Sequence, residues 1–304
     1  MNNHFKTVTA AALTAWLMTF SHHLGATQKP NSLTIPGAVP VKLAEGFSFT
    51  EGPAVDANGD IFFTDVPMNR IYKWSVADQA LSLFRANTGA ANGLFFDADG
   101  NLIACEGNAR RITATTPTGE VTTVISRFKG RRFNRPNDLW IDPKGGIYFT
   151  DPAYGRGGSD REINVDGVYY ISPQRDDIIR VSSDLNRPNG IIGSADGKRL
   201  FITELSGDKT WTYQIESDGH LSEKKLLIPA GSDGMTLDAK HNIYLTNQKS
   251  SAVDIYSSQG DHLQSISVPE TPANVTFGGP ERQTLFITAV TSLYSIDMQI
   301  RGDR

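Results

Sequence analysis

The sequence predicts an all-β, six-bladed β-propeller in a chain of 304 residues. One plan, a short apolar strand, a polar turn and a second apolar strand, recurs six times. The copies begin 41 to 52 residues apart, which matches the length of a four-stranded propeller blade. After residue 26, no segment carries apolar residues at helical spacing for more than two turns, so helical folds are disfavoured.

The first 26 residues resemble a cleavable export signal and are set apart from the fold. Lys6 supplies one positive charge, and an apolar run follows from Thr7 to Phe20. That run is too short to span a bilayer, and the small residues Gly25 and Ala26 come after it. We therefore expect a signal peptide at 1–26 and a single propeller domain at 27–304. A periplasmic or secreted protein without a membrane span follows from this interpretation.

The repeats account for the rest of the chain in order. The first runs from Gly52 to Asp65, with the turn Asp-Ala-Asn-Gly between two apolar strands. Later copies begin at Gly93, Asp138, Gly190, Gly234 and, most weakly, Val275. Outer strands are visible at 70–74 and 80–84, and again at 211–215 and 220–223. An open β-solenoid or a β-sandwich also uses such turns, but a sandwich does not repeat its loop chemistry at six equivalent places.

A carboxylate or carboxamide stands immediately before every repeat. We call these residues the first ring: Glu51, Asn92, Asn137, Asn189, Asp233 and Asn274. Equivalent positions of a closed propeller surround its axis. A single Asn or Asp before glycine is usually a turn residue, but six in register favour a shared metal held by at least three of them. An oxygen-only set suits calcium, whereas zinc prefers His or Cys. We expect one divalent cation, Ca²⁺, with Zn²⁺, Mg²⁺ and Mn²⁺ left open.

A second ring closes the second strand of each repeat: Asp65, Glu106, Asp151, Glu204, Asn247 and Ala289. Acids at a strand end commonly accept backbone N–H bonds, so this ring is expected to be structural. Asp151 and Glu204 are the expected exceptions, in contact with substrate.

Composition excludes several kinds of chemistry. The formal net charge is −4, and only the short stretch from Lys129 to Arg132 is densely basic, so nucleic acid is not an expected partner. Cys105 is the sole cysteine and lies in a strand-like run, which predicts a buried apolar role and no intramolecular disulfide. The six histidines fall in the signal or in predicted outer turns, and no Gly-x-Ser-x-Gly motif is present. A Ser-His-Asp site is therefore not expected.

Five short motifs carry a family resemblance. They are Phe-Thr-Glu-Gly-Pro at 49–53, Arg-Pro-Asn-Asp-Leu at 135–139, Tyr-Phe-Thr-Asp-Pro at 148–152, Arg-Pro-Asn-Gly at 187–190 and Ser-Asp-Gly-Met at 232–235. In this order they resemble the senescence marker protein/gluconolactonase/luciferin-regenerating enzyme-like family of six-bladed propellers. The resemblance covers roughly Val41 to Ile296. It implies that Glu51, Asn189 and Asp233 bind the metal, that Asn137 lies at the metal or the substrate, and that Arg135 contacts the substrate.

The resemblance implies a metal-dependent hydrolase that opens a small lactone, as gluconolactonases do, and the N-terminal signal implies that it is exported. Asp233 is the expected catalytic residue, which activates water or attacks the carbonyl while the metal polarises it. The expected metal ligands are Glu51, Asn137, Asn189 and Asp233, and the expected substrate-binding residues are Arg135, Asn137, Asn92, Asp151 and Glu204. Two alternatives stay open: a metal-dependent phosphotriesterase or arylesterase, and a non-catalytic binding propeller that calcium stabilises.

Overall fold

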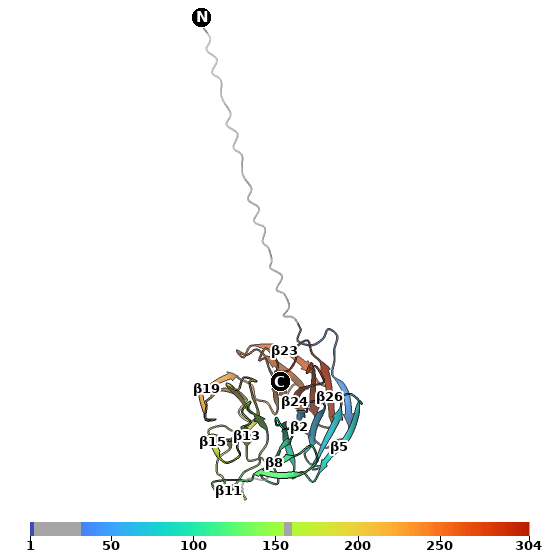
Figure 1. Cartoon of the computed structure of the whole chain (residues 1–304). Coiled ribbons are helices and arrows are strands. Elements are labelled where there is room, and N and C mark those ends of the chain that lie inside the picture. Colours follow the sequence, from blue (N-terminus) through green and yellow to red (C-terminus); the bar gives the residue numbers. More distant parts are fainter. Residues whose placement is uncertain (3–31, 155–159, 304) are drawn as a thin grey trace. The chain divides into compact units, whose positions relative to one another are not determined.

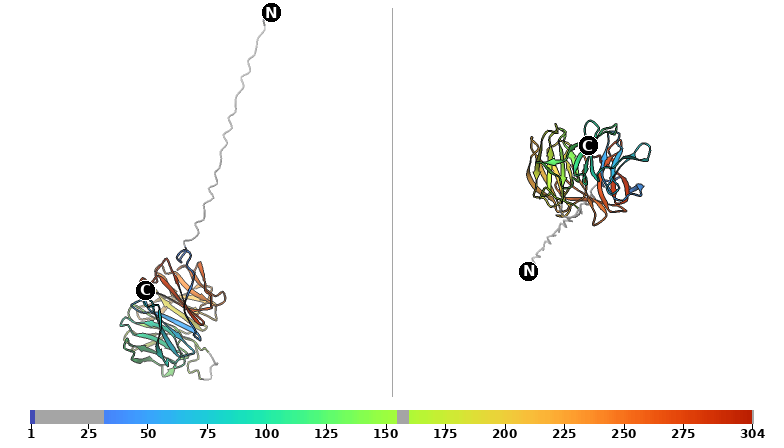
Figure 2. Two further views of the ribbon diagram at one scale, coloured as in Figure 1. Left: turned by 90° about the vertical axis from the view of Figure 1, so that its right-hand side faces the viewer. Right: turned by 90° about the horizontal axis from the view of Figure 1, so that it is seen from below.

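The computed structural model describes residues 1–2, 32–154 and 160–303. Residues 32–304 form one compact unit, and in the described part of the chain every regular element is a strand. Six four-stranded sheets surround a central channel (Figure 1, Figure 2). The predicted six-bladed β-propeller is therefore confirmed. The predicted signal peptide, apart from its first two residues, lies outside the described residues.

Each blade is an antiparallel meander whose first strand lies next to the channel. Blades 1 to 3 consist of β2 (Thr50–Val55), β3 (Ile61–Asp65), β4 (Arg70–Ser75) and β5 (Ala80–Ala86); β6 (Ala91–Phe96), β7 (Leu102–Glu106), β8 (Arg111–Thr115) and β9 (Val121–Ile125); and β12 (Leu139–Ile141), β13 (Ile147–Asp151), β14 (Gly167–Ile171) and β15 (Ile178–Ser182). Between blades 2 and 3 in the chain stands the small hairpin of β10 (Arg127–Phe128) and β11 (Arg131–Arg132).

Blades 4 to 6 repeat the arrangement, and the last one uses a strand from the other end of the chain. They consist of β16 (Pro188–Gly193), β17 (Arg199–Glu204), β18 (Lys209–Ile215) and β19 (Leu221–Ile228); β20 (Met235–Leu237), β21 (Ile243–Asn247), β22 (Ala252–Tyr256) and β23 (His262–Ser267); and β24 (Pro272–Gly278), β25 (Thr284–Ala289), β26 (Ser292–Asp297) and β1 (Val41–Glu45). Because β1 pairs with β26, the ring closes by backbone hydrogen bonds.

Apolar side chains pack between neighbouring blades. Six clusters of buried residues occur in the described chain, and each joins two adjacent blades. At the interface between blades 3 and 4, Trp140 of β12 stacks on Tyr148 of β13, with ring centroids 5.9 Å apart. Gly193 of blade 4 makes room for this indole, since a Cβ there would lie 2.3 Å from the ring. Burial of one large side chain is worth roughly 1.5–3 kcal/mol, so every interface contributes to closure.

Glycines follow the first ring because neighbouring inner strands approach closely. A Cβ on Gly52 would lie 1.9 Å from the carbonyl oxygen of Asn92, and one on Gly93 would lie 2.6 Å from the Cα of Asp138. Only Gly52 has a positive φ, +41°, whereas Gly93, Gly190 and Gly234 do not. Left-handed turn geometry therefore does not explain these Asn-Gly and Asp-Gly pairs, and steric crowding around the channel does.

Buried threonines in four of the blades join the end of the second strand to the start of the next inner strand. Thr64 donates its hydroxyl to the carbonyl of Asn92 at 3.1 Å, and Thr150 donates to that of Asn189 at 2.9 Å. Thr203 and Thr246 make the same kind of bond to Ser232 and Ala273. Each of these threonines stands one residue before a second-ring position. The repeated Thr-acid pair thus sets the place where the following inner strand begins.

Candidate active site

The starts of the inner strands surround a cavity of about 390 Å³, which we call the front cavity. Five of the six first-ring residues line it: Glu51, Asn92, Asn137, Asn189 and Asp233. Each comes from a different blade, so the site exists only in the closed ring. Arg135 and Tyr154 also line this cavity. The sixth member, Asn274, points instead into the channel beyond and donates to Glu51 Oε2 at 3.1 Å.

Two carboxylates meet at the inner end of the front cavity. Asp233 accepts hydrogen bonds from Asn189 Nδ2 at 2.6 Å and from Gln248 Nε2 at 2.8 Å, one on each oxygen. Glu51 accepts the N–H of Gly52 at 2.7 Å. Glu51 and Asp233 are 2% and 7% exposed. Neither forms an ion pair with a Lys, Arg or His of the described residues.

Burial disfavours the charged form of both carboxyls. It raises the pKa of Glu51 well above its ordinary value, and the nearby charge of Asp233 raises it further. Burial likewise raises the pKa of Asp233, although hydrogen bonds from Asn189 and Gln248 oppose this. A buried carboxylate pair without a cation is unfavourable, so the site is suited to a proton or a metal ion as its counter-charge.

The donor chemistry fits a hard divalent cation. Asn189 Nδ2 is held by Asp233 and by the Tyr154 hydroxyl at 3.0 Å, so its Oδ1 is left as a free acceptor among the described residues. The side chain of Asn137, only 7% exposed, makes no hydrogen bond to the described residues. Two carboxylates and two amide oxygens are therefore available, and no group of three His, Cys, Asp or Glu occurs in the described part of the chain. Such a set suits calcium better than zinc.

Two predicted substrate residues lie elsewhere. Asp151 and Glu204 do not line the front cavity. Asp151 accepts the N–H of Asn134 at 2.8 Å, and burial raises the pKa of Asp151 to about 7. Glu204 accepts the indole N–H of Trp211 at 2.9 Å. Both end their strands and hold a neighbouring segment, which is the structural behaviour expected of the rest of the second ring.

Arg135 stands at the cavity with an exposed side chain. Its guanidinium forms no ion pair or side-chain hydrogen bond with the described residues, unlike Arg110, which is paired with Asp160. An unpaired guanidinium is available for an anionic or hydroxyl-bearing ligand. Cys105, by contrast, is fully buried, and burial raises the pKa of its thiol well above the ordinary value. This burial agrees with the apolar role predicted for it and disfavours a nucleophile.

Three residues at the site escaped the sequence prediction: Asp138, Tyr154 and Gln248. Asp138 follows Asn137 within a recognised motif, immediately before β12 begins at Leu139, but it lines the channel beyond the front cavity. Tyr154 and Gln248 lie in connections after the second strands of their blades, where no repeat marks them. Only the hydrogen bonds to Asn189 and Asp233 reveal these two.

A family model decides the assignment: the SMP-30/Gluconolactonase/LRE-like region matches residues 49–291. The chain belongs to this family. Three relatives illustrate the range of the family. A gluconolactonase of Zymomonas mobilis is 31% identical over 81% of this chain and 78% of its own, and diisopropyl-fluorophosphatase of Loligo vulgaris is 25% identical over 84% and 91%. The structure of a gluconolactonase of Xanthomonas campestris superposes with a TM-score of 0.81 at 27% identity, over 88% and 91% of the two chains.

The resemblance to the family that the motifs indicated is thus confirmed, and the matched span lies inside the predicted Val41 to Ile296. As for membranes, none of the described residues forms a helix long and apolar enough to cross one.

Proposed function

We propose that this chain hydrolyses a small lactone with the help of one divalent cation held in the front cavity. The observation that carries the proposal is the convergence of Glu51 and Asp233, both buried and without a cationic partner, beside an unpaired Arg135. The gluconolactonase relative supports the substrate class. Oxygen-only ligands at Glu51, Asn137, Asn189 and Asp233 support calcium as the ion.

In this proposal, Asp233 transfers the proton and Arg135 binds the substrate. A divalent cation, when bound, supplies Lewis-acid polarisation of a carbonyl. Asp233 takes a proton from water as that water adds to the lactone carbonyl, and the same proton goes to the ring oxygen when the C–O bond breaks. Gln248 and Asn189 hold Asp233 in place through one bond to each of its oxygens. Arg135 binds a carboxylate or hydroxyl of the substrate.

The first test compares Asp233→Asn and chelator-treated protein with the native protein. We expect Asp233→Asn to lower kcat for lactone hydrolysis at least about 100-fold, because a positioned general base contributes roughly 10²–10⁴. Asp218→Asn, in an exposed turn, is the matched control and should keep the native rate. Unchanged hydrolysis both in Asp233→Asn and after chelation would eliminate the scheme.

Phosphotriester hydrolysis is the second candidate, and the similarity to diisopropyl-fluorophosphatase favours it. The same carboxylates and the same cation would serve a phosphoryl centre equally well. A panel of lactones, aryl esters and phosphotriesters at one pH separates the two functions by the highest kcat/KM.

Export is part of the proposal and depends on the N-terminal segment alone. The basic residue, the apolar run and the small residues before Thr27 support cleavage after Ala26. The intact mass of the exported protein tests this, since cleavage there leaves Thr27 as the first residue.

A further inference from the structure

A second cavity lies at the opposite end of the same channel, and we propose that it binds a small apolar organic cation, such as a primary amine of benzylamine size. We call it the rear cavity. It encloses about 290 Å³. The inner strands run along the channel from its front end to its rear end. Glu51, near the start of β2, lines the front cavity, and Val55, at the end of β2, lines the rear cavity. This inference does not need the hydrolysis itself, but its charge argument rests on the cation of the proposed function.

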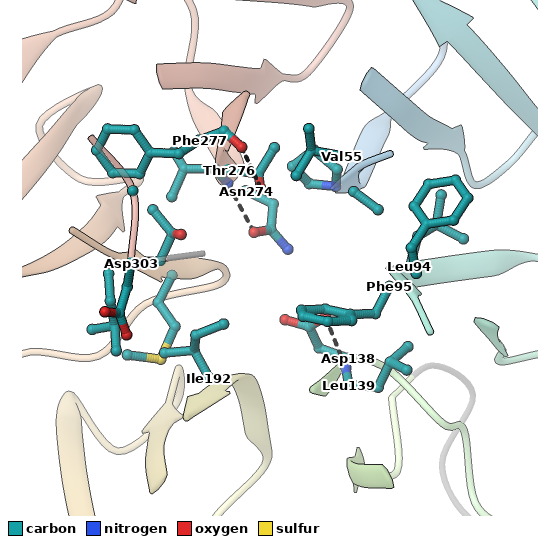
Figure 3. A pocket seen from close by; sticks show the side chains of 18 of the residues that line it. Val55, Leu94, Phe95, Asp138, Leu139, Ile192, Asn274, Thr276, Phe277 and Asp303 are labelled. Carbon is teal, nitrogen blue, oxygen red and sulfur yellow. Dashed lines mark hydrogen bonds between the residues drawn. The ribbon is translucent and has the colours of Figure 1, made fainter. Parts of the chain in front are cut away.

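The walls of the rear cavity are apolar around the whole ring. Every blade contributes: Val55, Leu94, Leu139, Ile192, Leu237 and Phe277 come from the six inner strands in turn. Figure 3 labels all of them except Leu237. Apolar cavities of roughly 150 Å³ already hold a benzene ring, so this volume accommodates a ring and a short head group. Apolar walls select the body of a ligand but do not orient it.

Polar atoms gather at the inner end of the rear cavity. Asp138 and Asn274 carry their polar ends toward its middle (Figure 3). The amide of Asn274 is already engaged, because its Nδ2 donates to Glu51 at 3.1 Å and its Oδ1 accepts the N–H of Val275 at 2.8 Å. Asp138 accepts the N–H of Leu139 at 2.9 Å and is also hydrogen-bonded to the N–H of Ile191 and to the side chain of Asn274, and it has no basic partner among the described residues. A ligand head that donates hydrogen bonds suits this end.

Charge favours an ammonium over a neutral donor. Glu51, Asp138 and Asp233 are all buried along one stretch of the channel. A divalent cation in the front cavity would compensate two carboxylates, and the Asp138 carboxyl would be left to accept hydrogen bonds from an ammonium head. At the outer end, Asp56, Asp97 and Asp303 line the cavity with Arg282, which donates to the carbonyl of Asp56, while Lys73 lies 3.8 Å from the Asp56 carboxylate and His241 lies 3.6 Å from that of Asp303. The outer end is therefore acidic on balance and attracts a cation.

The C-terminal segment defines the outer end of the rear cavity. Gly302 donates to the carbonyl of Arg282 at 2.8 Å, and Asp303 donates to that of Leu237 at 3.1 Å. Asp303 also accepts the N–H of Ala195 at 2.8 Å. Blades 4, 5 and 6 are thus joined by this segment, and the walls of the cavity are tied together before any ligand arrives. A preformed cavity avoids much of the entropy cost of ordering on binding.

Calorimetric titration of the calcium-saturated protein tests the proposal with three probes of one shape: benzylamine, benzyl alcohol and benzoate. We expect benzylamine to bind at least ten-fold more tightly than benzyl alcohol, and benzoate not to bind. Ile192→Trp fills the rear cavity and should abolish benzylamine binding, whereas Leu205→Trp, the matched variant in the front cavity, should leave it unchanged. Native-like thermal melting of Ile192→Trp shows that its fold is kept.

Asp138→Asn supplies a second, isosteric variant. It should bind benzylamine and benzyl alcohol with similar affinity, because the charge is gone and the shape is kept. Three results would overturn the proposal: no binding of benzylamine, equal binding of all three probes to the native protein, or loss of benzylamine binding in Leu205→Trp with retention in Ile192→Trp. The last result would place the amine in the front cavity.

Discussion

At the scale of single residues, the amide of Asn189 shows how hydrogen bonds would orient an oxygen toward the proposed cation in the front cavity. Its Nδ2 donates to both Tyr154 and Asp233, and these bonds turn its oxygen away from them. Asp233 is held on its other oxygen by Gln248, a residue from an exposed turn. Residues that orient a metal-binding side chain by hydrogen bonds commonly affect metal affinity nearly as strongly as the metal-binding residues themselves.

Tyr154→Phe removes one of the two acceptors that orient Asn189. We expect the affinity for calcium to fall roughly ten-fold, because loss of such an outer partner typically costs 10–100-fold. Titration with calcium, followed by calorimetry, measures this directly and does not depend on turnover. Tyr256→Phe, on the outer part of blade 5, is the control. An unchanged calcium affinity in Tyr154→Phe would show that Asn189 needs no such orientation.

The repeat predicted ring membership at this scale but not the direction of each side chain. Glu51, Asn92, Asn137, Asn189 and Asp233 converge as the spacing required. Asp151 and Glu204, the two second-ring residues predicted to contact substrate, do not reach the front cavity. Equivalent positions in a repeat do not specify the direction of a side chain or the N–H group from which it accepts a hydrogen bond. Asp151 turns to Asn134, and Glu204 turns to Trp211.

At the scale of strands, a threonine before the second-ring position links neighbouring blades at four of the six positions. Thr150 at the end of β13 accepts the N–H of Asp138 at 3.2 Å and donates to the carbonyl of Asn189 at 2.9 Å. One hydroxyl therefore connects the first-ring segments of blades 3 and 4. The geometry of the front cavity depends on such bonds because its side chains belong to different blades.

Thr150→Val keeps the shape of the side chain and removes these hydrogen bonds. We expect the free energy of unfolding to fall by about 1–3 kcal/mol, as for a buried group left unsatisfied. Lactone hydrolysis should fall as well, because Asn189 loses part of its support. Thr150→Ser retains the hydroxyl and should recover most of the stability, as measured by urea unfolding. Equal losses in both variants would assign the effect to packing alone.

Glu270 joins the closing strands of blade 6 and gives a pH prediction. Burial alone would raise its pKa, but hydrogen bonds from Ser292, Thr291 and Tyr294 outweigh burial and lower the pKa of Glu270 to about 2. Since its folded pKa lies below the unfolded value, the carboxylate stabilises the fold above about pH 4.5, and this stabilisation is lost as pH falls toward 2.

Glu270→Gln should therefore lower stability at pH 7 by up to about 3 kcal/mol, at roughly 1.4 kcal/mol per pKa unit. The difference from the native protein should shrink as the pH approaches 2. Unfolding by urea at several pH values measures it, with Glu120→Gln in an exposed turn as control. A difference that stays constant down to pH 2 would contradict the assigned cause.

At the scale of the whole molecule, a cation in the front cavity would connect four blades. Its expected ligands Glu51, Asn137, Asn189 and Asp233 come from blades 1, 3, 4 and 5. Binding to the folded state alone stabilises that state by mass action. The ring, already closed by β1 and by six apolar interfaces, would gain a further connection at its centre.

Removal of the cation should lower the melting temperature. At a calcium concentration of 100 times Kd, binding stabilises the fold by about 2.7 kcal/mol, and each kcal/mol shifts Tm by roughly 2 °C in a domain of this size. We expect a fall of about 5 °C on chelation, measured by calorimetry. A binding propeller would show the same fall with no turnover of any ester. An unchanged Tm, together with absence of metal in the purified protein, would contradict the site.

The order of apolar strands, polar turns and strand-ending acids was sufficient to predict six blades, and five short motifs were sufficient to predict the family, because these patterns are local in the chain. It was also sufficient to predict which residues surround the channel. Only the folded ring decides that Asn274 and Asp138 face the rear, that Asp151 and Glu204 bond to neighbouring segments, and that Tyr154 and Gln248 hold Asn189 and Asp233. Several of these relations join residues 15 or more positions apart, and the distances between them are set by how tightly adjacent blades pack.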